Sequence, residues 1–165
     1  MIYFIGDGGH ATVIRDLIHA RERLDKDFAQ IEGTIIAVGD NAARRREAQA
    51  HQSPYTCLVH PSATVASSAL IGMGTVIMAG AIVQARAVIG AHCILNTGCS
   101  IDHDCTLEDF VHVAPGAHLC GGVHVGEGAL IGVGVGIEPG VTIPAWSIVK
   151  RFPYVIEPVP SHATA

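Results

Sequence analysis

The sequence has no excess of positive charge and no basic tract. Ten Lys and Arg residues stand against fifteen Asp and Glu residues, giving a formal net charge of −5 at pH 7. The run Arg44-Arg45-Arg46 fits one solvent-exposed end of a helix better than a binding patch. Nucleic acids and anionic membranes attract clustered positive charge, so the composition argues against both as partners.

Metal-type spacing is also absent among the five cysteines. Four of them occupy equivalent positions of the repeat described below, which favours small buried side chains over disulfides or zinc ligands; they are Cys57, Cys93, Cys99 and Cys105. Cys120 falls at a turn. The chain has no signal-like start, because Met1-Ile2-Tyr3 runs straight into a predicted strand. We therefore expect a cytoplasmic protein with reduced thiols.

What the sequence does contain is a strict period of six. From Val59 to Val149, sixteen positions six residues apart are all Val, Ile or Leu, and the residue two places before each is small or β-branched. Neither the period of an α-helix nor that of an ordinary strand gives this register, whereas a solenoid of short strands and turns does. The sequence therefore predicts a β-helix with aliphatic and small-residue ladders inside and, at three hexads per coil, about five coils.

Glycine recurs three places after the aliphatic residue, where a corner needs positive φ, at Gly74, Gly80, Gly98, Gly116, Gly122, Gly128, Gly134 and Gly140. Residues 61–85 carry no charge and would pass for a membrane span by hydropathy alone. The unbroken hexad register through this stretch argues against that interpretation.

The first fifty-odd residues follow another pattern. Residues 3–5 read as a buried strand, residues 6–10 as a glycine turn and residues 11–24 as an amphipathic helix; a second strand at 34–38 and a helix at 42–51 follow. Such glycines let a backbone approach a diphosphate at a helix N-terminus, although packing alone also explains them. The acidic residue of a dinucleotide site lacks its strand context, so we expect no dinucleotide cofactor. We divide the chain into a small, shortened α/β Rossmann-like domain (1–56), a β-helix (57–150) and a tail (151–165).

Five stretches carry a family resemblance: residues 6–10 (GDGGH), 37–41 (AVGDN) with Arg44, 58–63 (LVHPSA), Asn96-Thr97 and 101–105 (IDHDC). They resemble the hexapeptide-repeat sugar acetyltransferases of the bacillosamine, perosamine and sialic-acid pathways. The resemblance implies a left-handed parallel β-helix that forms homotrimers, with acetyl-CoA as co-substrate in a groove between neighbouring β-helices. It also implies a nucleotide-linked amino sugar on the N-terminal domain, and acetylation of its amine, or of a hydroxyl in the sialic-acid branch.

Residue by residue, the family's catalytic histidine matches His103, and Asp104 is its acidic neighbour. An amine that attacks a thioester must lose a proton, which an imidazole can take while a carboxylate orients the ring. No covalent acyl-enzyme is required. From its position alone His103 could equally be a polar residue on a coil surface.

The resemblance also assigns secondary positions. On the sugar side it implies Gly6, Gly8, Gly9, His10, Gly39 and Asn96; on the acetyl-CoA side it implies His112, Gly121 and Val133. Of these, the Gly121 backbone N–H would meet the thioester carbonyl, and Val133 would line the pantetheine groove.

Three histidines six residues apart, His112, His118 and His124, suggest a zinc site at a subunit interface as an alternative. A spacing of six puts them on three faces of one prism, so one chain cannot bring them to one ion. We expect no metal.

The chain departs from the family twice. Between Leu24 and Gly33 it lacks the usual strand with an acidic pair. At its end a proline-rich, extended tail replaces a glycine-rich coil, although Lys150 and Arg151 remain for the CoA phosphates.

Three hypotheses for the function follow from the sequence: an N-acetyltransferase of a nucleotide-linked amino sugar, a sugar O-acetyltransferase, and a non-catalytic trimeric binding protein.

Overall fold

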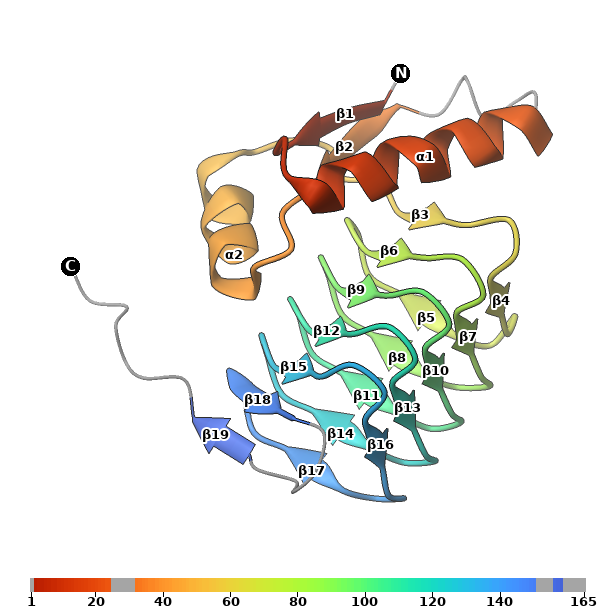
Figure 1. Ribbon diagram of the computed structural model, residues 1–165, viewed down its shortest axis with the longest axis vertical. Coiled ribbons are helices and arrows are strands. Elements are labelled where there is room, and N and C mark those ends of the chain that lie inside the picture. The colour runs from red at the N-terminus through yellow and green to blue at the C-terminus, as the bar shows by residue number, and fades with distance from the viewer. Residues whose placement is uncertain (1, 25–31, 151–155, 159–165) are drawn as a thin grey trace.

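A computed structural model of the chain describes residues 2–24, 32–150 and 156–158. From Leu58 to Val149 the chain winds into a parallel β-solenoid of about five turns, as the repeat predicts (Figure 1). A small unit of two helices and two strands lies over its first turns. The stretch between Leu24 and Gly33, where the chain lacks the family's usual strand, falls mainly on residues 25–31, outside the described residues.

Each coil gives one short strand to each of three parallel sheets. Sheet I contains β3 (Leu58–Val59), β6 (Val76–Ile77), β9 (Ile94–Leu95), β12 (His112–Val113), β15 (Leu130–Ile131) and β18 (Ser147–Val149). Sheet II contains β4 (Thr64–Val65), β7 (Ile82–Val83), β10 (Ser100–Ile101), β13 (His118–Leu119) and β16 (Gly136–Ile137). Sheet III contains β5 (Leu70–Ile71), β8 (Val88–Ile89), β11 (Thr106–Leu107), β14 (His124–Val125) and β17 (Thr142–Ile143). We name the corners I–II, II–III and III–I after the sheets they join, in chain order.

The solenoid interior consists of the two predicted ladders. Ile101 pairs in register with Val83 on one side and Leu119 on the other, so equivalent residues of neighbouring coils are eighteen apart and lie directly over one another. Ile101 and Cys99, two places before it, are both 0 % exposed. Burial raises the pKa of the Cys93 and Cys99 thiols to about 12, which makes them small apolar side chains, as expected.

The corners have the predicted left-handed backbone. All eight glycines that recur in the repeat have φ between +63° and +70°. Five residues with side chains adopt the same conformation at equivalent positions; they are Arg86, His92, Asp104, Phe110 and Trp146. The uncharged residues 61–85 form short strands and corners of the solenoid. Among the described residues, no helix is long and apolar enough to span a bilayer.

The N-terminal unit has the predicted order of strand, helix, strand and helix. β1 (Ile2–Ile5) pairs in parallel with β2 (Gly33–Ile36), α1 (Gly9–Leu24) joins them, and α2 (Asn41–Ala50) follows. Asp40 caps α2, because its side chain accepts a hydrogen bond of 2.7 Å from the backbone N–H of Ala43. The buried side of α1 packs with β3 and β6 in one apolar cluster that includes Ile14, Leu17, Leu58, Val76 and Met78.

Arg44 in α2 corrects one expectation. The run 44–46 was expected to be a solvent-exposed helix end, yet the Arg44 side chain is 1 % exposed. Its guanidinium donates hydrogen bonds to the carbonyl oxygens of His92 (2.8 Å) and Phe110 (2.7 Å) at corner III–I, and to those of Val38 and Gly39. These acceptors explain the burial, because a guanidinium buries well only where its N–H groups are satisfied. Burial lowers the pKa of Arg44 to about 10, so it stays protonated near neutral pH.

The end of the solenoid is covered by a returning strand. β19 (Ile156–Pro158) pairs antiparallel with β18, so part of the predicted tail is extended. Arg151, the second cation expected for the CoA phosphates, lies outside the described residues.

Replacing Arg44 with Met should destabilise the junction between the N-terminal unit and the solenoid. The carbonyls of His92 and Phe110 would lose their charged donor, and an unsatisfied buried polar group costs about 1–3 kcal/mol. We expect the thermal unfolding midpoint, at fixed protein concentration, to fall by about 5 °C or more. Arg45→Met is the control, because Arg45 makes a partly exposed pair of 3.4 Å with Glu127 and lies over the Trp146 ring, and these contacts involve no buried carbonyl oxygen. Equal losses in the two variants would contradict the role given to Arg44.

Candidate active site

His103 and Asp104 lie at corner II–III, which follows β10. Ile101 points into the core, and the corner then turns the following side chains outward, where Asp104 adopts φ of 60°. The His103 side chain is 57 % exposed and that of Asp104 is 43 % exposed. The structure therefore presents the predicted pair to solvent.

The two side chains form a histidine–carboxylate pair. His103 Nδ1 lies 2.7 Å from Asp104 Oδ2. Since a carboxylate only accepts, Nδ1 donates the proton in this pair, and a neutral ring keeps its lone pair on Nε2. This tautomer suits a general base, because Nε2 is the nitrogen left free to take a proton.

Arg86 completes the cluster, and it was not among the predicted site residues. Its Nε and Nη2 donate to Asp104 Oδ1 (2.6 Å) and Oδ2 (2.7 Å), a two-pronged pair. Hydrogen bonds from Arg86, followed by that from His103, lower the pKa of Asp104 to about 2. The signal that could have found Arg86 is its distance of eighteen residues from Asp104, one full coil.

Gly121 lies against the His103 ring from the next coil. A Cβ atom at Gly121 would come within 2.7 Å of His103 Cε1 and 2.8 Å of Nε2, so only glycine leaves this space. The neighbouring Gly122 N–H donates to the His103 carbonyl at 2.9 Å. The structure thus brings Gly121 together with His103 and Asp104, as a shared site requires.

The other predicted residues form a second group beneath the N-terminal unit. His112, on the outer face of sheet I, has its Nε2 3.1 Å from Asn96 Nδ2 and is hydrogen-bonded to the Gly39 backbone. Burial, then the positive charges of Arg44 and His10, lower the pKa of His112 to about 4. The resemblance implies that His112 belongs to the acetyl-CoA side; in the structure it contacts Asn96 and Gly39, two residues that the same resemblance implies for the sugar side.

His10 occupies the first turn of α1 and faces the same group. Burial, then the charge of Arg44, lower the pKa of His10 to about 4. Its Nε2 is buried without a hydrogen-bond partner among the described residues. A buried polar atom of this kind ordinarily has a partner, which a bound ligand or water can supply.

The glycines of the N-terminal turns divide into two kinds. Gly6 has φ of +115°, and a Cβ there would lie 2.8 Å from the Ala37 carbonyl oxygen, so packing alone explains it. Gly8 and Gly9 have no atom within 4 Å of an added Cβ, and Gly39 would make only an ordinary contact of 3.7 Å. Packing therefore does not explain Gly8 and Gly9. The space beside them at the start of α1 is open.

One chain does not bring the two groups together. In Figure 1, α2 lies to the left, beside β9, β12 and β15, whereas β10 and β13 lie to the right. Val133, the predicted pantetheine contact, is 65 % exposed at corner I–II, apart from both groups. The predicted site residues thus occupy separate sides of the solenoid.

The zinc alternative finds no support within one chain. His112, His118 and His124 lie on sheets I, II and III, as their spacing predicts. Within residues 2–24, 32–150 and 156–158, no three His, Cys, Asp or Glu side chains form a metal-binding group.

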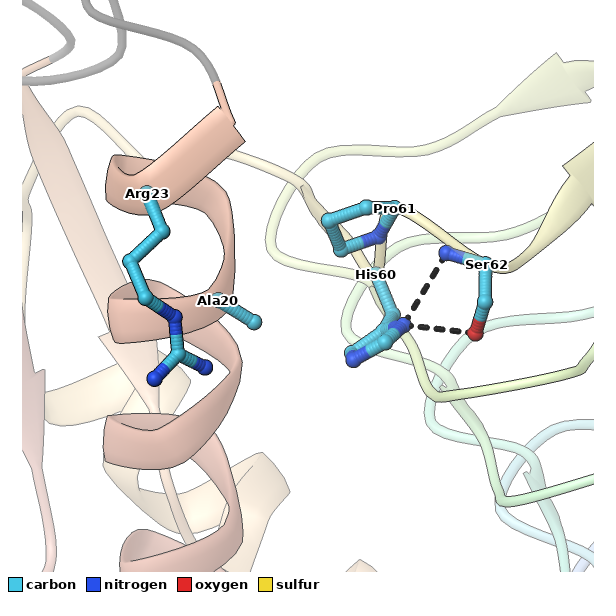
Figure 2. A pocket seen from close by; sticks show the side chains of 5 residues that line it. All are labelled: Ala20, Arg23, His60, Pro61 and Ser62. Carbon is cyan, nitrogen blue, oxygen red and sulfur yellow. Dashed lines mark hydrogen bonds between the residues drawn. The ribbon is translucent and has the colours of Figure 1, made fainter.

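A pocket between α1 and the first coil belongs to neither group (Figure 2). It is lined by Ala20, Arg23, His60, Pro61 and Ser62. His60 Nδ1 accepts the Ser62 backbone N–H at 3.1 Å and lies 2.8 Å from Ser62 Oγ. This part of the predicted 58–63 motif therefore stabilises a local turn at corner I–II.

The sequence is similar to that of a characterised acetyltransferase. No protein-family model matches the sequence. The UDP-N-acetylbacillosamine N-acetyltransferase of Bacillus subtilis (strain 168) is 42 % identical over a match that covers 41 % of this chain and 46 % of that protein, so the match spans less than half of the relative.

Solved structures match over nearly the whole chain. PerB from Caulobacter crescentus, in complex with CoA and GDP-perosamine, is 35 % identical, with a TM-score of 0.80 over 90 % of this chain and 84 % of that one. The acetyltransferase domain of PglB from Neisseria gonorrhoeae FA1090 is 32 % identical, with a TM-score of 0.83 over 97 % and 93 %. That domain has also been solved with acetyl coenzyme A.

The buried histidines make acid destabilise the fold. His10 and His112 have pKa values of about 4 in the folded chain, against 6.5 when unfolded. Between these values the unfolded chain binds more protons, so the contribution of these two histidines to the free energy of unfolding is complete above pH 6.5 and falls toward pH 4. Each histidine contributes up to about 1.4 kcal/mol per pH unit in this window.

Denaturant titrations between pH 7 and 4 would measure this slope. His112→Gln should reduce it by the share of one histidine, whereas His19→Gln should not, because the His19 side chain is 68 % exposed. An unchanged slope in His112→Gln would contradict the assignment.

Proposed function

This chain belongs to the hexapeptide-repeat sugar acetyltransferases of the bacillosamine and perosamine type, and on that premise we propose that it acetylates the amino group of a nucleotide-linked amino sugar. The chain is an acetyltransferase, and its acetyl donor is acetyl-CoA. We further propose that His103 is the general base and that the solenoid is left-handed. We also propose that the N-terminal unit is a Rossmann-like domain and that the protein is cytoplasmic. All five cysteines are free, which fits that location.

The observation that carries the proposal is the exposed His103–Asp104 pair. Asp104 accepts the Nδ1 proton, and Nε2 remains available to the attacking amine. The amine nitrogen bonds to the thioester carbonyl carbon, the carbon–sulfur bond then breaks to release CoA, and Nε2 takes the proton that the amine loses. Cys93 and Cys99 are buried thiols whose raised pKa values make them poor nucleophiles, which supports direct transfer.

The N-terminal unit is the proposed site of the sugar nucleotide. Open space at Gly8 and Gly9 admits a diphosphate to the N-terminus of α1, where backbone N–H groups and the helix dipole favour an anion. The unpartnered His10 Nε2 and the Asn96–His112 pair lie beside this space and offer polar contacts to the sugar. Binding energy from the diphosphate then positions the distant amine.

A homotrimer is the proposed active form, because His103 and the N-terminal turn lie on different sides of one chain. A neighbouring copy would bring its His103, Asp104 and Gly121 to the sugar held by the first, with acetyl-CoA and Val133 in the groove between them. Exposed apolar side chains on both sheets beside corner II–III support a contact surface there: Leu70 is 64 % exposed, Val88 41 % and Ile82 38 %.

His103→Ala should lower turnover about 10²- to 10⁴-fold, the usual loss for a general base. Its unfolding midpoint should stay near that of the parent, because the side chain is 57 % exposed. The assay follows CoA release from acetyl-CoA with UDP- and GDP-linked amino sugars, GDP-perosamine among them, and with free and linked hydroxyl acceptors. Retained activity would reject the base, and a preference for hydroxyl acceptors would indicate O-acetylation.

Gly8→Val should raise the KM for the sugar nucleotide about 10-fold, equivalent to a loss of 1.4 kcal/mol of binding. The fold should persist, because an added Cβ at Gly8 meets no atom within 4 Å. Gly6→Val is the contrasting variant and should lower stability. An unchanged KM in Gly8→Val would mean that the glycine turn binds no sugar nucleotide.

Mixing the two variants tests the shared site. If each site takes His103 from one copy and Gly8 from another, mixed trimers of His103→Ala and Gly8→Val contain some intact sites. Random assembly should restore about a quarter of the parent activity at low sugar-nucleotide concentration. Sedimentation of the parent as a monomer at micromolar concentration, or mixed trimers without recovery, would contradict this arrangement.

A further inference from the structure

Corner II–III contains two stacked residues whose backbone conformation favours glycine. Arg86 and Asp104 both have φ of 60°, and the equivalent residues of the next two coils are Gly122 and Gly140, each with φ of 70°. A left-handed backbone costs free energy for a residue with a Cβ atom, so such residues persist where their surroundings require them.

Packing accounts for the equivalent residues at corner III–I. There the His92 ring stacks on the Phe110 ring with centroids 5.3 Å apart, and Arg45 lies over the Trp146 ring. Arg44 of α2 donates hydrogen bonds to the backbone carbonyl oxygens of His92 and Phe110. These side chains join the N-terminal unit to the solenoid, which explains their retention.

No such packing explains Arg86 and Asp104. Their side chains are 66 % and 43 % exposed, and an exposed ion pair contributes little to stability. Instead, the two residues are connected to His103: Asp104 Oδ2 accepts a hydrogen bond from Arg86 Nη2 and lies 2.7 Å from His103 Nδ1.

We propose that Arg86 is a positioning residue for acetyl transfer, which fixes the Asp104 carboxylate so that the His103 ring keeps its proton on Nδ1 and its free Nε2 outward. The inference rests on the function proposed above. With both oxygens held by the Arg86 fork, the carboxylate cannot rotate away from the ring. Small displacements of a base from its acceptor reduce rates strongly, so the fork acts on turnover more than on substrate binding.

Arg86→Gly separates this role from a structural one, because the two predict opposite changes in stability. Glycine removes the strain of the left-handed backbone together with the fork. We expect an unfolding midpoint at or above that of the parent, with kcat reduced about 10-fold or more and the KM for acetyl-CoA unchanged. A fall in midpoint with unchanged kcat would overturn the proposal and make Arg86 a structural residue.

Arg86→Lys and Arg86→Gln give a graded comparison. Lys keeps the charge but not the fork, so its kcat should lie between those of the parent and Arg86→Gln. Arg45→Gln is the matched control, since it breaks a partly exposed arginine–carboxylate pair at another corner and should leave kcat unchanged. Equal kcat values for the parent and Arg86→Gln would overturn the proposal.

A spectroscopic measurement separates this inference from the proposed function. Nitrogen-15 spectra of histidine-labelled protein, with the His103 signals identified by their loss in His103→Ala, report which ring nitrogen carries the proton without any substrate. The parent should show the Nδ1 proton, and Arg86→Gln should show exchange between both nitrogens. An unchanged ring overturns the inference, whereas a changed ring with unchanged turnover supports the coupling and rejects His103 as the base.

Discussion

The whole molecule depends on vertical stacking at eighteen-residue intervals. Parallel pairing places each residue directly over its equivalent in the next coil, so a side chain's neighbours are set by coil position. Inside, this gives aliphatic and small-residue ladders. Outside, it puts Arg86 over Asp104 and Gly121 under the His103 ring. The proposed catalytic cluster thus follows from the same register that builds the core, and needs no loop of its own.

A second constraint is the satisfaction of buried polar groups where α2 meets corner III–I. Arg44 donates to four carbonyls, two from the solenoid and two from the turn that contains Gly39. Burial, and after it the charge of Arg44, lower the pKa values of His10 and His112 to about 4, so both imidazoles beside the open glycine turn are neutral near pH 7. The arginine that joins the two parts of the chain therefore also contributes to the electrostatics of the proposed sugar site.

The hexad pattern predicted the solenoid, its interior and its glycine corners, because those features depend only on which residue types recur. It could not predict Arg44 or Arg86. A lone arginine at a corner looks like any surface charge until the coil above it is known, and Arg44 is buried by carbonyls of residues 92 and 110, far along the chain. Likewise the resemblance named His112 and Gly121 together, but only coordinates show that one faces Gly39 and the other His103.

Because the two groups of predicted site residues lie on different sides of the solenoid, one chain alone does not complete the proposed site. A base accepts a proton only from an atom within hydrogen-bond reach, and His103 lies at corner II–III while the turn with Gly8 lies beyond sheet I. The N-terminal unit is held in place by Arg44 and by the apolar cluster of α1, so it cannot carry a sugar around the prism. A second copy can supply the missing half, since the sides of corner II–III expose apolar side chains that a solenoid alone leaves uncovered. In the proposed trimer, assembly is therefore part of catalysis, because only two copies together contain both halves of the proposed site.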